Sequence, residues 1–447
     1  MRKTVLYLSA LLLLALAVRL GAMHAVILPR AAVSGFAPFY FPDSAQLWET
    51  AANLAGNGVY ETADRLRAWR MPLPPLLLAG ARAAGVTNPD CARIANILFD
   101  VLNVFLLWHL ARKMFSPAAG WLAGLAGALY PFHVFLSALI LSDTLAHTAV
   151  LLMVEALLAC RTALADASAG GRPGGWKRPA VWLGLSLGLA ALTKASLGLL
   201  PVPAGLYLLW QIRRGDIPFR PGVQTLLLSG TVFALALSGW WLRNYRQFGE
   251  FVPFSTMGGF TLWESTGPGA DGGANHGKVA FPEWYRRGRA VLAAQPGARA
   301  RDAAGVAVPG AAGGEPLETA LDRALRRETA AAARNAPARA LRLCWEKFRR
   351  TWNPVPNWQG ADAWPYKAAM LLGYLPVLLL ALAGMAVFYR RRAEICILLL
   401  PAFYLAAVHC VFMGSVRYRV PAEGCLIILA AGTLCALFSA KSRAPRD

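Results

Sequence analysis

One acidic residue, Asp43, lies in a proline- and aromatic-rich segment directly after the first long apolar run of the chain. The segment reads Phe41-Pro42-Asp43-Ser44, and aromatic residues on both sides surround the carboxylate with apolar bulk. Such surroundings raise the pKa of a carboxylate and prepare it to accept a proton. The alternative is a solvated loop carboxylate without a chemical role, which is the expectation for the nearby Glu61 and Asp64. Asp43 is therefore the candidate general base of this sequence.

A second acid, Asp143, opens an apolar run in the segment Leu141-Ser142-Asp143-Thr144. One interpretation is an N-cap, which satisfies free backbone N–H groups at the start of a helix. The other is that Asp143 faces Asp43 across a cavity, as a metal ligand or as a group that orients a second reactant. His133 and His147 are close in sequence, and a carboxylate with an imidazole can hold a divalent ion, although this spacing matches no metal motif. No cofactor motif is present, and a divalent metal on Asp143 and His133 stays an open alternative.

Several cations lie next to apolar runs, where a bound phosphate group would need them. Lys194 ends one run, Arg243 follows Trp240-Trp241-Leu242, and Arg417-Tyr418-Arg419 precedes Pro421. Arginine grips phosphate with two parallel hydrogen bonds, so Arg417 and Arg419 are the stronger candidates. Lys194 could instead extend its ammonium to the membrane interface, and Arg243 could be an interfacial anchor in an aromatic belt.

Composition places these residues in a membrane protein. The chain has 447 residues, of which 57% are hydrophobic and 15% charged, and its mean hydropathy is +0.44. The net charge of +21 comes from arginines and lysines in short segments between apolar runs, which is the positive-inside pattern rather than a nucleic-acid-binding face. The seven cysteines form no CxxC motif, which argues against a disulfide framework and a zinc–sulfur site.

The apolar runs predict an all-α polytopic bundle of about ten transmembrane helices. The first run is interpreted as an uncleaved anchor, and loop charge puts both termini in the cytoplasm. Asp43, Asp143, Lys194 and Arg417 then all belong to the outer face. The predicted spans are residues 5–28, 94–110, 118–131, 144–160, 181–192, 197–210, 223–242, 368–388, 395–412 and 425–438.

Three regions follow from this division: an N-terminal transmembrane bundle (1–242) that includes a first outer loop (29–90), an outer-face loop (243–364) and C-terminal transmembrane helices (365–447). Within the second loop, residues 258–314 are rich in Gly, Ala and Pro and are expected to form turns. Residues 317–352 are expected to form two amphipathic helices on the membrane surface, with a break at Pro337.

Five motifs, in this order, resemble those of the bacterial membrane glycosyltransferases of the protein-mannosyltransferase-like group, glycosyltransferase family 39. The first three are Asp43 in the first outer loop, Arg70-x-Pro72-x-x-Pro75 at its end and Thr193-Lys194 at a helix turn. The last two are Trp241-x-Arg243-Asn244-x-x-x-Phe248-Gly249 and Arg417-Tyr418-Arg419-x-Pro421. The sequence departs from the family pattern at Ala45, where relatives have a second carboxylate, and at Leu47, where many have Tyr.

The resemblance implies a GT-C-type fold in a bacterial plasma (inner) membrane, with the active site at the outer face. It implies inverting transfer of a hexose or pentose from a polyprenyl-phosphate donor to a hydroxyl of a protein, lipid or glycan. Asp43 would be the base and Asp143 the second acid, while Lys194, Arg243, Arg417 and Arg419 would hold the donor phosphate. Arg70 and Trp263 are the candidates on the acceptor side, and Trp284 and Tyr285 could also stack on a sugar ring.

Two other functions stay open at this stage. A flippase or transporter of a polyprenyl-linked or anionic solute would use the same cations but would need no base, and broken helices at matched places in two halves would favour it. A ligase or polymerase of the O-antigen type would also act at the outer face, but an acid in a large first loop fits it poorly. Sequence offers no nucleotide-sugar site, because no Gly-rich strand–turn–helix is present.

Overall fold

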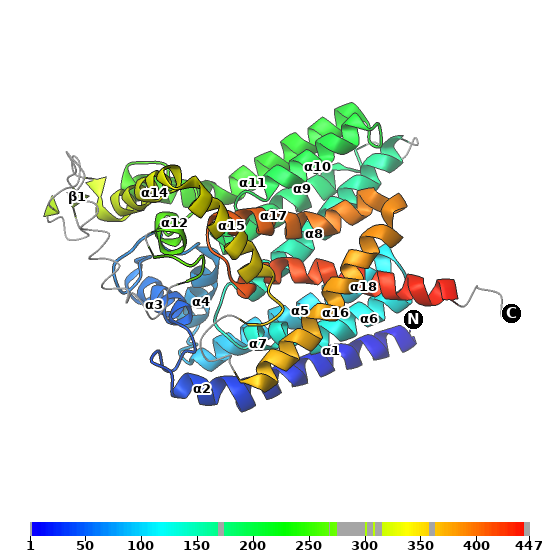
Figure 1. Cartoon of the computed structure of the whole chain (residues 1–447), viewed down its shortest axis with the longest axis horizontal. Coiled ribbons are helices and arrows are strands. Elements are labelled where there is room, and N and C mark those ends of the chain that lie inside the picture. The colour runs from blue at the N-terminus through cyan, green and yellow to red at the C-terminus, as the bar shows by residue number, and fades with distance from the viewer. Residues whose placement is uncertain are drawn as a thin grey trace.

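A computed structural model gives the fold as one bundle of helices, with both termini at one end and a group of shorter helices at the other (Figure 1). It describes residues 2–168, 174–267, 269–274, 300–301, 307–308, 315–356 and 363–441. Trp284 and Tyr285 lie outside the described residues.

The first half of the chain forms the larger part of the bundle. Its helices are α1 (Arg2–Ala22), α2 (Leu28–Ala32), α3 (Pro42–Asn57), α4 (Leu73–Ala83), α5 (Pro89–Met114), α6 (Pro117–Leu129), α7 (Pro131–Ser137), α8 (Asp143–Ser168), α9 (Lys177–Thr193), α10 (Pro201–Arg213) and α11 (Phe219–Phe248). A π-helical turn, Met23–Ile27, joins α1 to α2, and a 3-10 turn, Ala195–Leu197, follows α9.

The second half begins with shorter elements and ends with three long helices. They are α12 (Gly258–Thr266), β1 (Ala300–Arg301), β2 (Ala307–Val308), β3 (Glu315–Pro316), α14 (Leu317–Asn335), α15 (Pro337–Trp352), α16 (Trp364–Val387), α17 (Arg392–Val411) and α18 (Val420–Lys441). β1 pairs antiparallel with β2 and parallel with β3. Two 3-10 turns, Tyr389–Arg391 and Val416–Arg419, precede α17 and α18.

Eight helical segments of the described chain are long and apolar enough to cross a membrane, or nine if the bent pair α6 and α7 counts as one span. The predicted number was about ten. The difference has two physical causes: Pro131 breaks the third run, so that α6 and α7 meet at 55°, and α9 has 17 residues, at the lower limit for a span. The eight segments are Arg2–Ala32, Pro89–Met114, Asp143–Ala167, Ala195–Arg213, Phe219–Phe248, Trp364–Val387, Tyr389–Val411 and Val416–Ser439.

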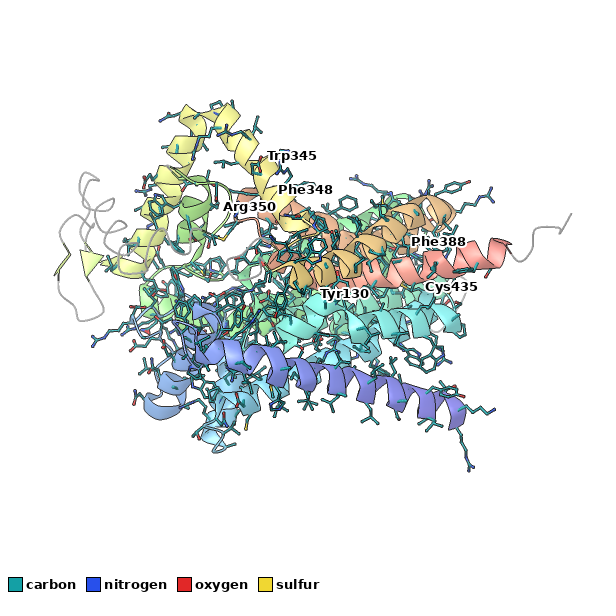
Figure 2. All side chains as sticks on the ribbon, turned by 60° about the horizontal axis from the view of Figure 1, so that its bottom comes forward. Tyr130, Trp345, Phe348, Arg350, Phe388 and Cys435 are labelled. Atoms are coloured by element: carbon teal, nitrogen blue, oxygen red, sulfur yellow. The ribbon has the colours of Figure 1, made fainter. Side chains whose placement is uncertain are left out.

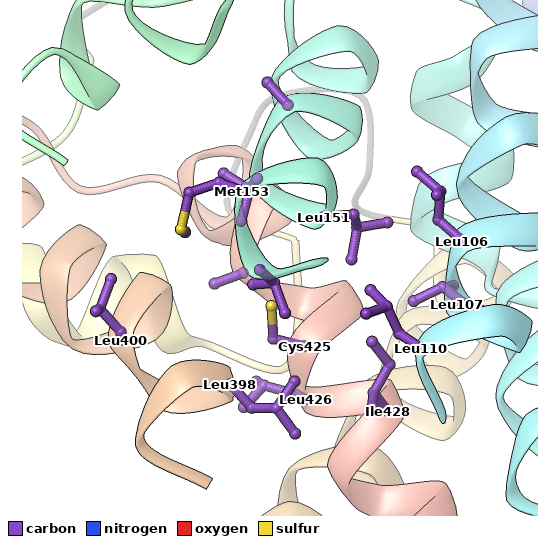
Figure 3. Packing of buried hydrophobic residues seen from close by; sticks show 14 of the residues in the cluster. Leu106, Leu107, Leu110, Leu151, Met153, Leu398, Leu400, Cys425, Leu426 and Ile428 are labelled. Carbon is purple, nitrogen blue, oxygen red and sulfur yellow. The ribbon is translucent and has the colours of Figure 1, made fainter. Parts of the chain in front are cut away.

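The core of the bundle surrounds α18, which is the most buried of these spans. Cys425, Leu426 and Ile428 of α18 pack with Leu107 and Leu110 of α5, and Figure 3 shows side chains of α8 and α17 in the same cluster. Lipid tails are as apolar as leucine, so close packing rather than removal from water holds such helices together.

Glycines allow helices of the bundle to approach one another closely. A Cβ atom at Gly124 of α6 would lie 2.7 Å from Leu11 Cδ2, and one at Gly184 of α9 would lie 2.5 Å from the carbonyl oxygen of Ser229 in α11. Gly188 continues the contact of α9 with α11, where a Cβ would lie 2.6 Å from Ala236 Cβ, and Gly120 of α6 lies against α5, where a Cβ would be 2.9 Å from the carbonyl oxygen of Trp108. This is the small-residue packing that brings membrane helices into backbone contact.

The helices at the left end of Figure 1 differ in part from the prediction for the second loop. Residues 258–266 form α12 rather than turns, whereas the break at Pro337 is confirmed, because α14 ends at Asn335 and α15 begins at Pro337. α14 buries its apolar side within the protein, where Leu325 packs with Leu66 and Trp69. On α15, by contrast, the Trp345 ring is exposed and stacks on that of Phe348 (Figure 2).

We predict that Gly184→Ala destabilises the protein, because its methyl group must displace the backbone of α11 or be displaced by it. Overpacking of this kind costs about 1–3 kcal/mol. Gly230→Ala is the matched control, since a Cβ there meets nothing within 4 Å and alanine favours a helix by up to about 1 kcal/mol. Thermal unfolding of both variants in detergent measures the difference. Equal midpoints would mean that α9 and α11 are not in backbone contact.

Candidate functional site

Asp43 lies in the first turn of α3, where its carboxylate accepts hydrogen bonds from two arginines. Arg70 Nη2 donates to Asp43 Oδ1 at 2.5 Å, and Arg417 Nη1 donates to Asp43 Oδ2 at 2.7 Å. Gln46, one turn further along α3, holds Arg70 in place by accepting from its Nε at 3.1 Å. Arg70, which precedes α4, is thereby joined to the first turn of α3.

Asp143 is the first residue of α8, and its side chain is fully buried. Lys194 Nζ donates to Asp143 Oδ1 at 2.7 Å, and Arg417 Nε donates to Asp143 Oδ2 at 2.8 Å. Both oxygens therefore point to cations, which decides against the simple N-cap. Arg417 bridges the two carboxylates, with Nη1 on Asp43 and Nε on Asp143.

Local structure aims each cation at this cluster. Lys194 has an extended backbone after the last turn of α9, which ends the helix and turns the side chain toward α8. Ser415 caps the 3-10 turn that carries Arg417, with its hydroxyl oxygen accepting from the Arg417 backbone N–H. The Tyr418 ring lies 4.9 Å from Lys194 Nζ and stacks on His409 at 4.4 Å.

The pKa of Asp43 is opposite to the prediction. Burial by itself raises the pKa of this carboxyl, but the charges of Arg70 and Arg417 and their hydrogen bonds outweigh burial and hold the pKa well below its usual range. The sequence showed only the aromatic neighbours, and those neighbours would raise it. Asp43 is thus firmly ionised and a weak base while both arginines stay paired with it.

The cluster lines a cavity of about 1540 Å³. Asp43, Arg70, Lys194 and Arg417 are on its wall, whereas Asp143 lies behind Lys194 and Arg417 and is not part of the lining. Three cations face two carboxylates, so the cluster keeps a net positive charge. An apolar part of the cavity adjoins it, formed by residues of the bundle: Phe132, Phe135, Leu136, Leu199, Val408 and Phe412.

Two predicted phosphate ligands are engaged elsewhere. Arg243 donates to the backbone oxygens of Arg67 and Tyr60, and Arg419 donates to Glu423 and to the backbone of Thr351. Neither lines the cavity. An arginine beside aromatic residues can bind a phosphate or can donate hydrogen bonds to buried backbone carbonyl groups. The sequence pattern is the same in both cases, so it could not distinguish a phosphate ligand from a structural arginine.

The remaining candidates divide in the same way. Trp263 packs near Leu66, Trp69 and Leu325 outside the cavity lining, so it is not placed to stack on a bound sugar. His133 lies with Glu423, at 3.2 Å, while both oxygens of Asp143 are taken by cations. The structure therefore does not bring together the pair considered for a metal.

Glu318 of α14 is a site-supporting residue that sequence reasoning missed. Its carboxylate accepts from the backbone N–H groups of Arg67 and Ala68, at 2.6 and 2.9 Å, and from the Thr256 hydroxyl. This fixes the segment that leads directly to Arg70. Only the position of Glu318 at the start of a predicted helix was visible in the sequence.

Comparison with known protein families finds a similarity in the first half of the chain. Residues 71–241 match the family described as dolichyl-phosphate-mannose-protein mannosyltransferase. The match covers less than half of the chain, and it agrees with the resemblance that the motifs carry. No curated protein matches the chain in sequence.

Solved structures confirm the GT-C-type fold. The archaeal oligosaccharyltransferase AglB from Archaeoglobus fulgidus, solved with an inhibitory peptide and a dolichol-phosphate, aligns with a TM-score of 0.57 at 12% identity, over 99% of this chain and 52% of that one. The apo form of the Archaeoglobus fulgidus oligosaccharyltransferase aligns with a TM-score of 0.54 at 10% identity, over 97% of this chain and 51% of that one. The chain thus spans about half the length of these proteins. ArnT from Cupriavidus metallidurans, bound to undecaprenyl phosphate, aligns with a TM-score of 0.37 at 14% identity, over 97% and 78%.

We predict that Arg417→Met destabilises the protein strongly, because it leaves the buried Asp143 carboxylate with one cation. Breaking a buried ion pair by removing one partner costs roughly 3–5 kcal/mol. Adding Asp143→Asn to this variant should restore part of the loss. The exposed pair Arg214 and Asp216 provides the control, because Arg214→Met should cost at most about 1 kcal/mol. Thermal unfolding in detergent compares the four proteins. A loss for Arg417→Met no larger than the control would contradict the bridge.

Proposed function

We propose that the chain transfers a sugar from a polyprenyl-phosphate donor to an acceptor hydroxyl in this cavity, by direct inverting displacement. One observation supports the proposal above all: Asp43 contacts Arg70 and Arg417 on the wall of a cavity. Part of the same cavity is lined by apolar side chains. A lipid phosphate leaving group needs cations, an acceptor hydroxyl needs a base, and a polyprenyl chain needs apolar surface. The family's description names a dolichyl-phosphate sugar, which agrees with that combination.

The donor phosphate is assigned to Lys194 and Arg417, the two cavity cations that share Asp143. Asp143 itself acts as a positioning residue, because it is buried behind the two cations and holds each of them by one oxygen. The polyprenyl chain then extends along the apolar wall that includes Leu199 and Val408. A phosphate bound here is the stabilised leaving group of the reaction.

Donor binding also explains how a weakly basic Asp43 becomes a base. A phosphate competes with Asp43 for Arg417 Nη1, the same group that now donates to Asp43 Oδ2. When Arg417 turns to the phosphate, Asp43 keeps only Arg70 as a partner, and the effect of burial then raises its pKa. The acceptor hydroxyl then gives its proton to Asp43 while its oxygen bonds to the anomeric carbon. The bond from that carbon to the phosphate oxygen breaks, and its electron pair leaves with the lipid phosphate.

The orientation in the membrane follows from the ends of the bundle. Both termini lie at the end opposite the short helices (Figure 1). Basic residues also lie near that end, where Arg391 donates to the carbonyl of Met114 at the end of α5. By the positive-inside rule this end is cytoplasmic. The cavity then opens at the outer face, with a protein, lipid or glycan as the acceptor.

Removing the base is the direct test. We predict that Asp43→Asn lowers sugar transfer by about 100-fold or more, while binding of a polyprenyl phosphate is retained, because Lys194 and Arg417 remain. The assay uses the full chain in proteoliposomes with a mixture of polyprenyl-phosphate sugars. Asp64→Asn in the same loop is the control and should keep wild-type activity. Transfer that survives Asp43→Asn would assign the base elsewhere, and lipid-phosphate binding without any transfer would favour a flippase.

The pH profile tests the arginine clamp. In the wild type, Arg70 keeps the pKa of Asp43 low, so Asp43 stays ionised as the pH falls toward the usual aspartate value of about 4. Arg70→Gln removes the largest lowering influence and lets burial raise that pKa. We therefore predict that the acid limb of kcat/KM moves to higher pH in Arg70→Gln and is unchanged in Arg82→Gln. An unmoved limb in Arg70→Gln would show that Arg70 does not control Asp43.

A further inference from the structure

A second polar cluster lies inside the bundle and is not used by the proposed reaction. It joins Asp100 of α5, His133 of α7, His147 of α8 and Glu423 of α18, all of which are at most 3% exposed. One ligand atom each from Asp100, His133 and His147 can be chosen such that all three lie within 4.8 Å of one another. Ionisable groups at such depth in a membrane bundle are costly and indicate a functional site.

The histidines of this cluster have unused nitrogens. Both ring nitrogens of His147 have no hydrogen-bond partner among the described residues, and Nε2 of His133 and Oε2 of Glu423 have none there apart from their contact with each other. The rings of His133 and His147 lie 4.6 Å apart between centroids. Buried imidazole nitrogens are almost always satisfied in proteins, so several unsatisfied ones around one point indicate a missing partner.

Distances agree with a metal ion as that partner. His133 Nε2 lies 3.2 Å from Glu423 Oε2. Two ligands of a tetrahedral zinc ion are about 3.4 Å apart, given metal–ligand bonds near 2.0–2.1 Å. Asp100, His133 and His147 each have a ligand atom within 4.8 Å of the other two, so an ion among them requires an inward movement of side chains. Glu423 adjoins this group through His133.

The surrounding residues make room for this arrangement and support it. Gly424 lies against His147, where a Cβ would be 2.2 Å from Nε2, so only glycine leaves the imidazole in place. Arg19 Nε donates to Asp100 Oδ2 at 2.8 Å, and Asn103 donates to Asp100 Oδ1 at 3.1 Å. Such outer contacts orient a ligating carboxylate, which still has lone pairs for a metal.

Charge selects the kind of ion. Arg19 pairs with Asp100, and Arg419 with Glu423, so the carboxylates are already neutralised. Hard cations such as Mg²⁺ and Ca²⁺ depend on carboxylate charge and gain little here. Ions that bind neutral imidazole strongly, above all Zn²⁺, gain from the two histidines.

We propose that Asp100, His133, His147 and Glu423 form a buried binding site for a transition-metal ion of the Zn²⁺ class. The site is separate from the cavity cluster, and it does not depend on the proposed transfer reaction. Its ligands come from α5, α7, α8 and α18, so the ion would join four helices of the bundle. This is the role of a structural metal site, in which protein side chains occupy every position around the ion.

The test is the metal content of the full chain, purified in detergent from cells grown with added zinc and measured by mass spectrometry. We expect about one zinc per wild-type chain. His133→Ala and His147→Ala should each lower this content by about tenfold or more, whereas His24→Ala, at an exposed position, should not. Wild-type protein without zinc, or variants that keep it, would overturn the site.

Two further measurements keep the test valid if a histidine variant fails to fold. Gly424→Ala should reduce zinc content, because its methyl group displaces His147 Nε2. Wild-type protein treated with a strong chelator should unfold at a lower temperature and recover when Zn²⁺ or Co²⁺ is added, but not with Mg²⁺. Bound Co²⁺ would also give the visible absorption of a tetrahedral nitrogen–oxygen site. An unfolding temperature that is insensitive to chelator and zinc would overturn the proposal.

Discussion

The bridge that Arg417 makes between Asp43 and Asp143 is the interaction on which the site depends. It connects the first turn of α3 and the start of α8 to the 3-10 turn before α18, and the residues it joins are separated by up to 374 positions in sequence. The segment before Arg417 is held from outside the bundle: Lys347 of α15 donates to the carbonyl of Val411, and Gly414 donates to that of Gly272. Contacts from α15 and from the segment at Gly272 therefore fix the position of the chain that leads to Arg417.

The two polar clusters handle charge in different ways, and depth explains the difference. Both carboxylates of the buried cluster are paired with an arginine, Asp100 with Arg19 and Glu423 with Arg419. An unpaired charge at this depth would cost several kcal/mol. At the cavity, Arg70, Lys194 and Arg417 exceed the carboxylates by one, which is tolerable only beside space that a charged ligand can enter. An excess positive charge beside the apolar part of a cavity is suited to an amphiphilic anion, and it keeps Asp43 a weak base until such an anion arrives.

The sequence predicted the all-α fold and the approximate number of spans, because both depend on local patterns of apolar and basic residues. Its motifs predicted the resemblance to the family that residues 71–241 match. It also selected Asp43, Asp143, Lys194 and Arg417, which the structure brings into one cluster. It could not predict that Arg243 and Arg419 face backbone carbonyls and Glu423, since residue type and aromatic neighbours are the same in both settings. The predicted direction of the pKa shift of Asp43 was wrong for a related reason. The pKa is lowered by Arg70 and Arg417, and only the tertiary fold brings these arginines close to Asp43.

α8 and α18 contribute to both the cavity cluster and the buried histidine cluster, so packing in the interior affects the geometry of the cavity cluster. α8 carries Asp143 at its first residue and His147 one turn later, while Arg417 lies in the 3-10 turn before α18 and Glu423 in the first turn of α18. A rotation or shift of either helix that separates His147 from Gly424, which lie in contact, would also move Asp143 relative to Arg417. Helices within a bilayer gain little from apolar contact alone, so polar contacts at depth are the means of fixing their register. The buried cluster thus sets the distance over which Arg417 must reach two carboxylates.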